Sequence, residues 1–280
     1  MVQKTDLNVS PYYDDFDETD NFNRVLFRPG FAIQARELTQ LQSTLQNQIE
    51  KFGGHVFAEG AMVIPGSTGL DTQYYSLKLA STFASETVDP AQYFNATTPV
   101  TLTGETSGVT AVVVGFDIAT TTDQPTLYLR YLATGTDNIS AVFADGENIS
   151  ADAGITHTTS YSSNIASATT FTSTFSAAAG SSAANLESST GPASRKGSAV
   201  TIQAGVYYIR GMFTLCSEET LVLEKYKTTP SYRVGFTITE TLVTPESDTT
   251  LLDNSTGSSN FAAKGAHRLQ VSLSLAKLDR

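Results

Sequence analysis

The sequence predicts a mainly β protein of the α+β class, with one N-terminal amphipathic helix packed on an interrupted antiparallel β body and a small inserted all-β module. Apolar residues recur at helical spacing most clearly within residues 33–52. Elsewhere, short alternating runs are separated by Gly, Pro, Asn and Asp, a pattern typical of strands and turns. Only 16% of the residues are charged, below the roughly 25% usual for globular domains. Thr, Ser, Ala and Gly take their place, which is common in extended or assembled β proteins.

The helix is predicted from the spacing of its apolar residues. Leu38, Leu41, Leu45, Ile49 and Phe52 follow at intervals of 3, 4, 4 and 3 residues, which places them on one face. The glycine pair at 53–54 predicts the C-terminal end. The other faces carry uncharged amides: Gln40, Gln42, Gln46, Asn47 and Gln48. Two arrangements remain open. The apolar face lies on the sheet of its own domain, or the helix packs against copies of itself with amides hydrogen-bonding across the seam.

The strand patterns fall into two regions that we expect to form one sheet. Residues 55–80 contain a hairpin-like run at 56–64 and a strand at 74–79. A short stretch of residues 200–240 has a similar strand–charge–Gly–Met pattern, too short to be a repeat, and the two regions are predicted to be strands of one sheet. Clean alternation at Leu269–Leu275 adds a further strand near the C-terminus.

Composition divides the chain into four predicted parts. They are an N-terminal docking segment with the helix and first hairpin (1–97), an inserted small all-β module (98–155), a Ser/Thr/Ala-rich linker (156–198), and a C-terminal β region that completes the first sheet (199–280). The linker is predicted because Glu187 is the only charged residue between Thr158 and Ser194, and large apolar residues are sparse. An extended strand on a neighbouring subunit is the alternative for this segment.

The charge balance restricts the function classes. A formal net charge of −11 argues against nucleic-acid binding through phosphate neutralisation and against docking on an anionic membrane. The N-terminus has no apolar signal region and no window reaches 18 apolar residues, so we expect a soluble protein with no membrane partner.

No catalytic, cofactor-binding or metal-binding residues are predicted. His55, His157 and His267 lack metal-ligand spacing, and the single cysteine, Cys216, lies in an apolar run typical of a small core residue. The acidic run at 14–20 does not fit a calcium loop, because the required Gly and Glu positions are not met. A solvated acidic run that pairs with arginines or a neighbouring subunit is favoured instead. We therefore expect a protein that is not an enzyme and that uses no cofactor.

The residues before and along the helix are the candidate partner-binding site. Aromatic side chains among acids suit a segment that inserts anchors into a partner while its charges stay at the rim. The candidates are Tyr12, Tyr13, Asp15, Phe16, Arg24, Arg28, Gln34, Arg36, Gln42 and Gln46. A short strand is predicted at 24–27, stopped by Pro29-Gly30. We expect residues 1–30 to lie across another chain, with the hairpin at 56–64 covering the apolar face of the helix.

The segment from Pro11 through Gly66 resembles the N-terminal region, a domain of unknown function, shared by baseplate and tail-fibre proteins of tailed phages, especially cyanophages. The run from Leu251 to Leu269 resembles a loop of that family, with the form Asp-Pro-Ala-x-Gly followed by Asn-Tyr/Phe-Ala-Ala-Pro-Gly-Ala-His-Arg. This chain departs from it at Asn254-Ser255 and at Lys264, which replaces Pro. With the stretch 205–243, the resemblance covers more than half of the chain.

The resemblance implies a virion structural protein of the phage tail, at the baseplate or the baseplate-proximal part of a tail fibre, assembled in the host cytoplasm. Its expected partners are other tail proteins and copies of itself, with a trimer favoured. One alternative is a distal receptor-binding protein that recognises a host-surface glycan. Another, of a different class, is a tail-associated polysaccharide-degrading enzyme.

Overall fold

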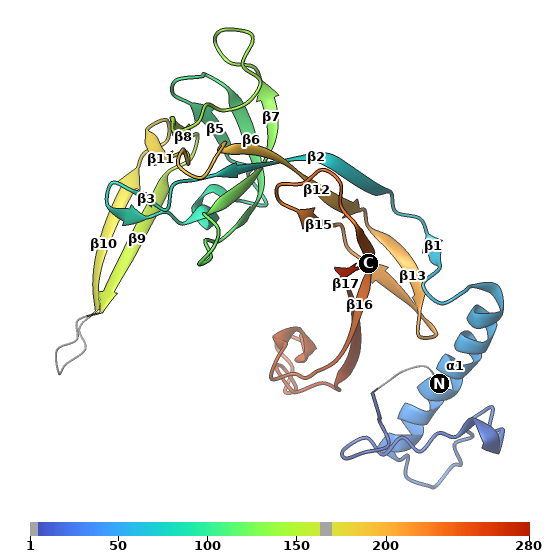
Figure 1. Cartoon of the computed structure of the whole chain (residues 1–280). Coiled ribbons are helices and arrows are strands. Elements are labelled where there is room, and N and C mark those ends of the chain that lie inside the picture. Colours follow the sequence, from blue (N-terminus) through green and yellow to red (C-terminus); the bar gives the residue numbers. More distant parts are fainter. Residues whose placement is uncertain (1–4, 163–169) are drawn as a thin grey trace. The chain divides into compact units, whose positions relative to one another are not determined.

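The computed structural model describes residues 5–162 and 170–280, and in this part of the chain it is mainly β, with a single α-helix and antiparallel sheets (Figure 1). The chain forms two compact units. The first unit comprises Met1–Gly69, Thr201–Leu221 and Tyr232–Arg280, and the second comprises Leu70–Val200 and Val222–Ser231. The predicted boundary at residue 98 therefore does not separate two compact parts.

The second unit is built around an eight-stranded sheet with the strand order β11-β8-β5-β6-β7-β2-β12-β15. Its strands are β2 (Thr68–Lys78), β5 (Thr101–Gly104), β6 (Thr110–Asp117), β7 (Thr126–Ala133), β8 (Asn148–Ala151), β11 (Ser182–Asn185), β12 (Ser194–Ile202) and β15 (Glu219–Glu224). Short elements complete it: β3 (Thr82–Phe83), β4 (Glu86–Thr87) and the 3-10 helix η2 (Pro90–Tyr93). Strand β7 pairs with both β6 and β2, so the predicted inserted module continues the sheet rather than standing apart.

The core of the second unit consists of apolar side chains on these strands, and β6 and β7 each bury a run of consecutive residues. Leu77, Leu102, Leu127 and Ile149 are fully buried, and many of their neighbours are alanine or valine. Because small residues allow close approach of sheet and loops, this Thr- and Ala-rich sequence reaches a packed interior with few large side chains.

The predicted linker at 156–198 is wrong. Strands β9 (Ile155–Ser162) and β10 (Thr170–Ala177) form an antiparallel ribbon whose ladder runs from the Ile155–Ala177 pair outward, and β11 and most of β12 follow. Residues 163–169 of the segment lie outside the described residues. The composition of the segment predicted a linker because it lacks the large apolar residues needed for a core of its own. The described part of the segment is ordered instead by packing Ala183 and Ala184 into the core of the surrounding sheet.

The first unit contains two small β layers and the helix. Its elements are η1 (Glu18–Asp20), α1 (Ala35–Val56), β1 (Met62–Ile64), β13 (Gly205–Ile209), β14 (Met212–Cys216), β16 (Tyr232–Val243), η3 (Thr249–Leu251) and β17 (Arg268–Asp279). Strand β1 pairs with β13, as predicted for the two halves of the sequence, and β13 pairs with β14. Strands β16 and β17 form a twelve-residue ribbon whose inward-facing residues pack on β13 and β14. Cys216 is buried in this second core, as expected for a small apolar residue.

A buried histidine ties the β9–β10 ribbon to η2. The His157 side chain is fully buried, and its Nδ1 atom accepts the Asp89 backbone N–H at 3.2 Å. The proton therefore resides on Nε2, which donates to the Ala183 carbonyl at 3.0 Å, while the Tyr93 hydroxyl donates to the same carbonyl at 2.9 Å. Burial lowers the pKa of His157 and outweighs the opposing influence of the Ala183 carbonyl and Asp89. The imidazole is thus a neutral structural connector.

We expect the stability of the second unit to fall as the pH drops below 6.5, the ordinary pKa of histidine. The unfolded chain takes up a proton there while the folded chain resists it, so this contribution is present above 6.5 and lost below it. The His157→Gln variant should lose that pH dependence, measured as the free energy of unfolding by urea titration between pH 7.5 and 5. His55→Gln, at an exposed helix position, is the control and should keep it. Equal pH profiles for the two variants would contradict the assignment.

Candidate functional site

The candidate site is the N-terminal surface, which we define as residues 5–34 together with α1. The helix begins after Gln34, whose backbone N–H donates to the Glu37 carboxylate at 2.8 Å, so a first-turn side chain satisfies a free helix donor. The predicted end at Gly53-Gly54 is wrong, because α1 continues to Val56. Two adjacent glycines weaken a helix, and tertiary contacts at this point offset that weakness.

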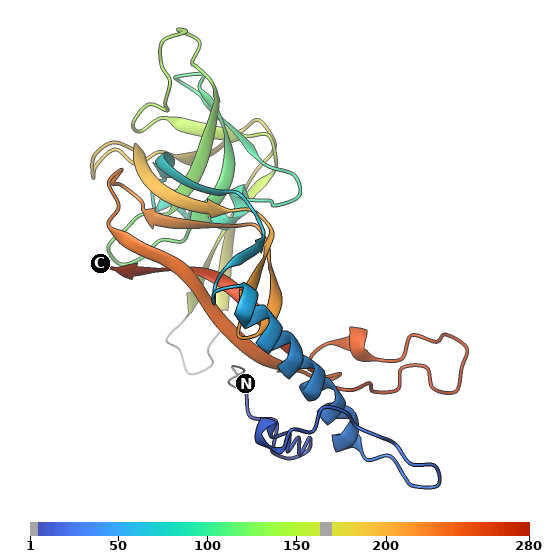
Figure 2. The same ribbon diagram turned by 90° about the vertical axis from the view of Figure 1, so that its right-hand side faces the viewer.

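The helix is held by the β13–β14 hairpin (Figure 2). A Cβ atom at Gly53 would lie only 2.5 Å from the ring of Tyr208, so only glycine allows this approach. The Tyr208 hydroxyl donates to the Glu50 carbonyl at 2.7 Å, and the Gln46 amide donates to the Gly211 carbonyl at 2.7 Å. These contacts explain why the glycine pair lies inside the helix rather than after it.

The hairpin turn is itself fixed by its backbone and by a buried ion pair. Arg210 and Gly211 both have positive φ, +48° and +74°, as a two-residue turn matching the strand twist requires. The Arg210 guanidinium donates to the Glu240 carboxylate, whose side chain is 5% exposed. The same carboxylate accepts the backbone N–H of Thr5 at 2.8 Å. Glu240 therefore connects the β13–β14 turn, which contacts α1, to β16 and to Thr5 at the start of the described chain.

The polar face of α1, not its apolar face, is covered by the rest of the chain. Asn47 and Thr44 are buried, at 4% and 7% exposure. The segment before the helix supplies the cover through three carboxylates. Asp14 accepts from Ser43, Asp15 from Arg36 and Gln40, and Glu18 from Asn47 and Lys51. The acids were expected to pair with Arg24, Arg28 or a neighbouring subunit. Asp15 and Glu18 instead form ion pairs with cations of the chain's own helix.

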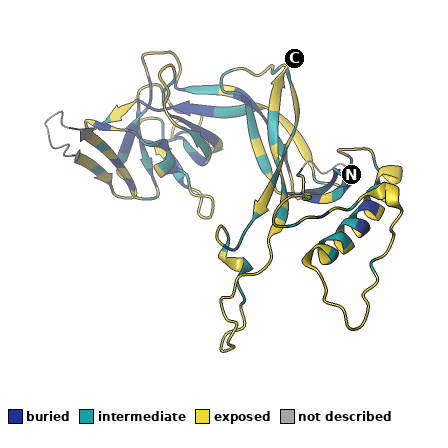
Figure 3. Cartoon of the chain, turned by 90° about the horizontal axis from the view of Figure 1, so that it is seen from below, coloured by how far each residue is buried: buried dark blue, intermediate teal, exposed yellow. Residues whose placement is uncertain are grey.

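The apolar stripe of α1 is exposed, and Figure 3 colours the helix with buried, intermediate and exposed residues. We define the stripe by its exposed fractions: Leu38 50%, Leu41 38%, Leu45 58%, Ile49 44%, Phe52 69% and Val56 55%. The expectation that its own sheet or the 56–64 run covers this face is wrong, because the residues that α1 buries within the chain are Thr44, Asn47 and Gly53. Full burial of a large apolar side chain contributes about 1.5–3 kcal/mol, so covering the remaining half of six such residues would contribute about 5–9 kcal/mol.

The residues before the helix expose further apolar side chains. Phe22, Leu26, Phe31 and Ile33 are 58–75% exposed, and the predicted strand at 24–27 is not formed. With the stripe, they make a much larger apolar area than scattered surface residues would. Exposed apolar side chains in this number are the usual mark of a protein-binding surface.

The structure brings part of the predicted site together. Asp15, Phe16, Arg24 and Arg36 line one hollow of about 320 Å³ beside α1. Four other candidates have separate positions: Arg28 lies over the Phe31 ring at 4.5 Å, Gln34 precedes the helix, Gln42 is exposed next to the stripe, and Gln46 holds Gly211. Tyr13 is 57% exposed with φ of +49°.

Tyr12 provides a contact that the sequence alone did not predict. Its hydroxyl hydrogen-bonds with Nδ1 of His267, and the two rings meet edge to face with centroids 5.7 Å apart. Tyr12 and His267 lie in the N-terminal and C-terminal motifs of the sequence, so the two motifs meet in the first unit. The only feature of the sequence that pointed to this contact is that both motifs occur in the same chain.

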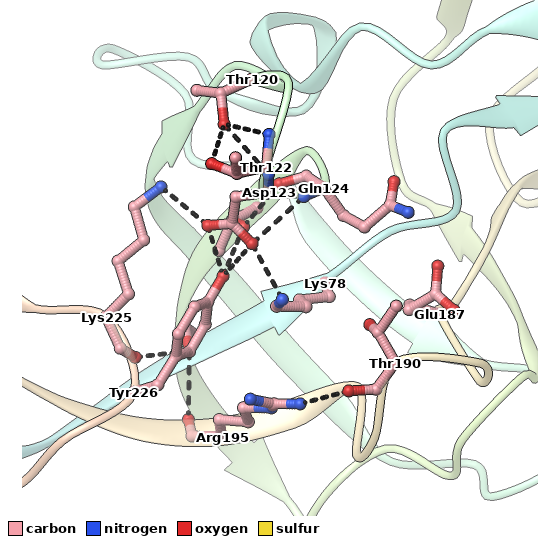
Figure 4. A network of polar contacts seen from close by, with 12 residues as sticks. Lys78, Thr120, Thr122, Asp123, Gln124, Glu187, Thr190, Arg195, Lys225 and Tyr226 are labelled. Atoms are coloured by element: carbon pink, nitrogen blue, oxygen red, sulfur yellow. Dashed lines mark hydrogen bonds and ion pairs between the residues drawn. The ribbon is translucent and has the colours of Figure 1, made fainter.

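The second unit contains a polar network that we considered as a second candidate (Figure 4). The Asp123 carboxylate accepts from Lys78 at 2.8 Å, from Tyr226 and from Lys225. Burial raises the pKa of Asp123, but the hydrogen bonds from Lys78, Tyr226 and Lys225 outweigh it and lower that pKa to about 2. Lys78 also lies over the Tyr226 ring at 4.5 Å. These groups satisfy one another, so we assign the network to joining β2, the turn before β7 and residues 222–231.

The described part of the chain presents neither a metal-binding cluster nor a membrane-spanning helix. There, no group of three or more His, Cys, Asp or Glu side chains is placed to hold a metal ion. Among the same residues, no helix is long and apolar enough to cross a membrane.

Comparison with known proteins identifies the family. A family model described as a domain of unknown function, DUF4815, matches residues 10–171 and 177–280. The match spans both motifs and both units, and the chain belongs to this family. No curated protein and no solved structure matches the chain.

Substituting the two helix glycines should have opposite effects. We expect Gly53→Ala to destabilise the first unit by roughly 1–3 kcal/mol through overpacking against Tyr208. In Gly54→Ala the new Cβ would meet the nearest atom, the Tyr208 hydroxyl, at an ordinary 3.5 Å. That variant should stabilise the helix by about 0.5–1 kcal/mol. Circular dichroism during chemical unfolding measures both, and equal effects would disprove the docking geometry.

Removing the charge at the centre of the polar network should destabilise the second unit. Asp123→Asn leaves Lys78, only 9% exposed, without its carboxylate, at an expected cost of about 3–5 kcal/mol. The low pKa means that the wild-type contribution is present above the ordinary value of 3.8 and lost as the pH falls towards 2. Acid unfolding curves should therefore converge for variant and wild type below pH 2. An unchanged stability at pH 7 would refute this role.

Proposed function

We propose that the protein is a non-enzymatic structural subunit of a phage tail, located at the baseplate or the baseplate-proximal part of a tail fibre. It acts by assembling with other tail proteins and with copies of itself, a trimer being the first expectation, and it is incorporated into the virion within the host cytoplasm. The resemblance of the N-terminal and C-terminal motifs to tail proteins supports the assignment. The Tyr12–His267 contact adds support, because the two motifs form one local structure.

The observation that carries the proposal is the exposed apolar area of the N-terminal surface. A monomer in water gains nothing from exposing Phe22, Leu26 and the stripe of α1, whereas an assembly subunit can bury them on a neighbour. The polar side chains around this area are already bound within the chain: Asp15 and Glu18 hold the helix. The surface therefore provides apolar contact on a rigid support, and this suits permanent assembly more than catalysis.

Replacing two of these apolar residues should block incorporation without unfolding the protein. Phe22 and Leu26 are 71% and 75% exposed, so Phe22→Asp with Leu26→Asp should leave the unfolding curve unchanged. We expect the copy number of the variant in the particle to fall at least about tenfold, because loss of a central anchor costs about 2 kcal/mol or more. Quantitative mass spectrometry of purified particles, from phage complemented with each variant, measures the copy number.

The matched control is Ile118→Asp, at a residue that is 65% exposed in the second unit. It introduces one negative charge, in place of two, on a comparably exposed apolar residue and should be incorporated normally. Normal copy number for the double variant would remove the N-terminal surface as the assembly element. Absence of the wild-type protein from purified particles would overturn the proposed function itself.

A further inference from the structure

We propose that the occupant of the α1 stripe is the same stripe of a second copy of this chain. This deepens the proposed function by naming the partner of the surface, and its physical basis is the pattern and the charge of the helix. The contact is one between helices of identical sequence, along the full length of the stripe.

The stripe has an eleven-residue repeat. Leu38, Leu41 and Leu45 recur eleven residues later as Ile49, Phe52 and Val56. Eleven residues span three turns at about 3.67 residues per turn, close to the 3.6 of a straight helix. The stripe therefore runs almost parallel to the helix axis, over about 27 Å at 1.5 Å per residue. A second, nearly straight helix can lie along all of it without pronounced supercoiling.

The sides of the stripe carry no charge. On the helical wheel, Gln42 lies next to Ile49 on one side, Gln48 lies next to Leu41 on the other, and both amides are exposed. Amides both donate and accept hydrogen bonds, so identical amides can pair across a symmetry axis, whereas identical charges repel. The stripe with its flanks is thus self-complementary, which an interface between identical subunits requires.

The charged residues of α1 are placed where they do not oppose this contact. Arg36 and Lys51 point to the chain's own carboxylates on the opposite face, and Glu37 accepts from the helix start. Because each copy carries a formal charge of −11, copies repel one another over most of their surfaces. The uncharged stripe is a surface on which they can meet at low electrostatic cost.

The test is the oligomeric state of the full chain. Light scattering coupled to size exclusion, at tens of micromolar, should show an oligomer for the wild type. Leu45→Glu with Ile49→Glu should raise the dissociation constant at least about a hundredfold. Ile139→Glu, at a residue 83% exposed in the second unit, is the matched control and should remain oligomeric. Both altered stripe residues are exposed in the monomer, so circular dichroism should show an unchanged fold.

Cross-linking locates the contact directly. Leu45→Cys, near the middle of the stripe, should join two copies with a short bis-maleimide in either helix direction, while the wild type, with Cys216 buried, should not react. A monomeric wild type, an oligomer that persists in the double variant, or no cross-link would each overturn the proposal. If a monomeric wild type still enters particles, the occupant is another tail protein and the proposed function stands. A stripe-dependent oligomer that is absent from virions would instead overturn the proposed function alone.

Discussion

The contact of α1 with the β13–β14 hairpin determines how the N-terminal surface is presented. Gly53 lets the Tyr208 ring touch the helix backbone, and Gln46 is bonded to the hairpin turn at Gly211. Thr44 and Asn47, on another side of the helix, are buried as well, so α1 turns two sides inward and the apolar stripe lies outside both. The side with Asn47 is polar, and burial of Asn47 is tolerable because Glu18 accepts its amide. Exposure of the apolar stripe thus follows from a well-satisfied local structure.

One carboxylate connects this docking to the rest of the first unit. Glu240 accepts from Thr5 and from Arg210, so it links the start of the described chain, the hairpin turn and β16. A buried carboxylate of this kind is strongly destabilising if one partner is lost. The Tyr12–His267 contact adds a second link between the ends of the sequence. Segments more than 230 residues apart in sequence are therefore held by polar contacts beside a small apolar core.

The second unit makes a different use of polar side chains. Its core contains mainly Leu, Val and Ala, and polar connectors hold the segments that pass over it. His157 remains neutral because it is buried between a backbone donor and a backbone acceptor, whereas Asp123 remains charged because two lysines and a tyrosine surround it. Both groups therefore join segments that are distant in the sequence.

The sequence by itself determined what depends on local pattern. It placed α1 near its observed position, predicted a mainly β fold with antiparallel strands, and assigned the regions of β1 and β13 to one sheet. Asp15, Phe16, Arg24 and Arg36 line one hollow, and their role in binding a partner stays a prediction. Periodicity and turn residues are properties of neighbouring positions, so the chain alone is enough to reveal them.

The tertiary structure decided which helix face is covered, where α1 ends, and that residues 156–198 contribute strands. These outcomes depend on contacts between distant residues: Gly53 with Tyr208, Asp14 with Ser43, and Ala183 with the core of the sheet. An amphipathic pattern shows that one face is apolar, but it does not show whether that face is buried in the same chain. The physical reason is that burial depends on the relative energies of all available contacts, and here the polar face of α1 had the better partners within the chain.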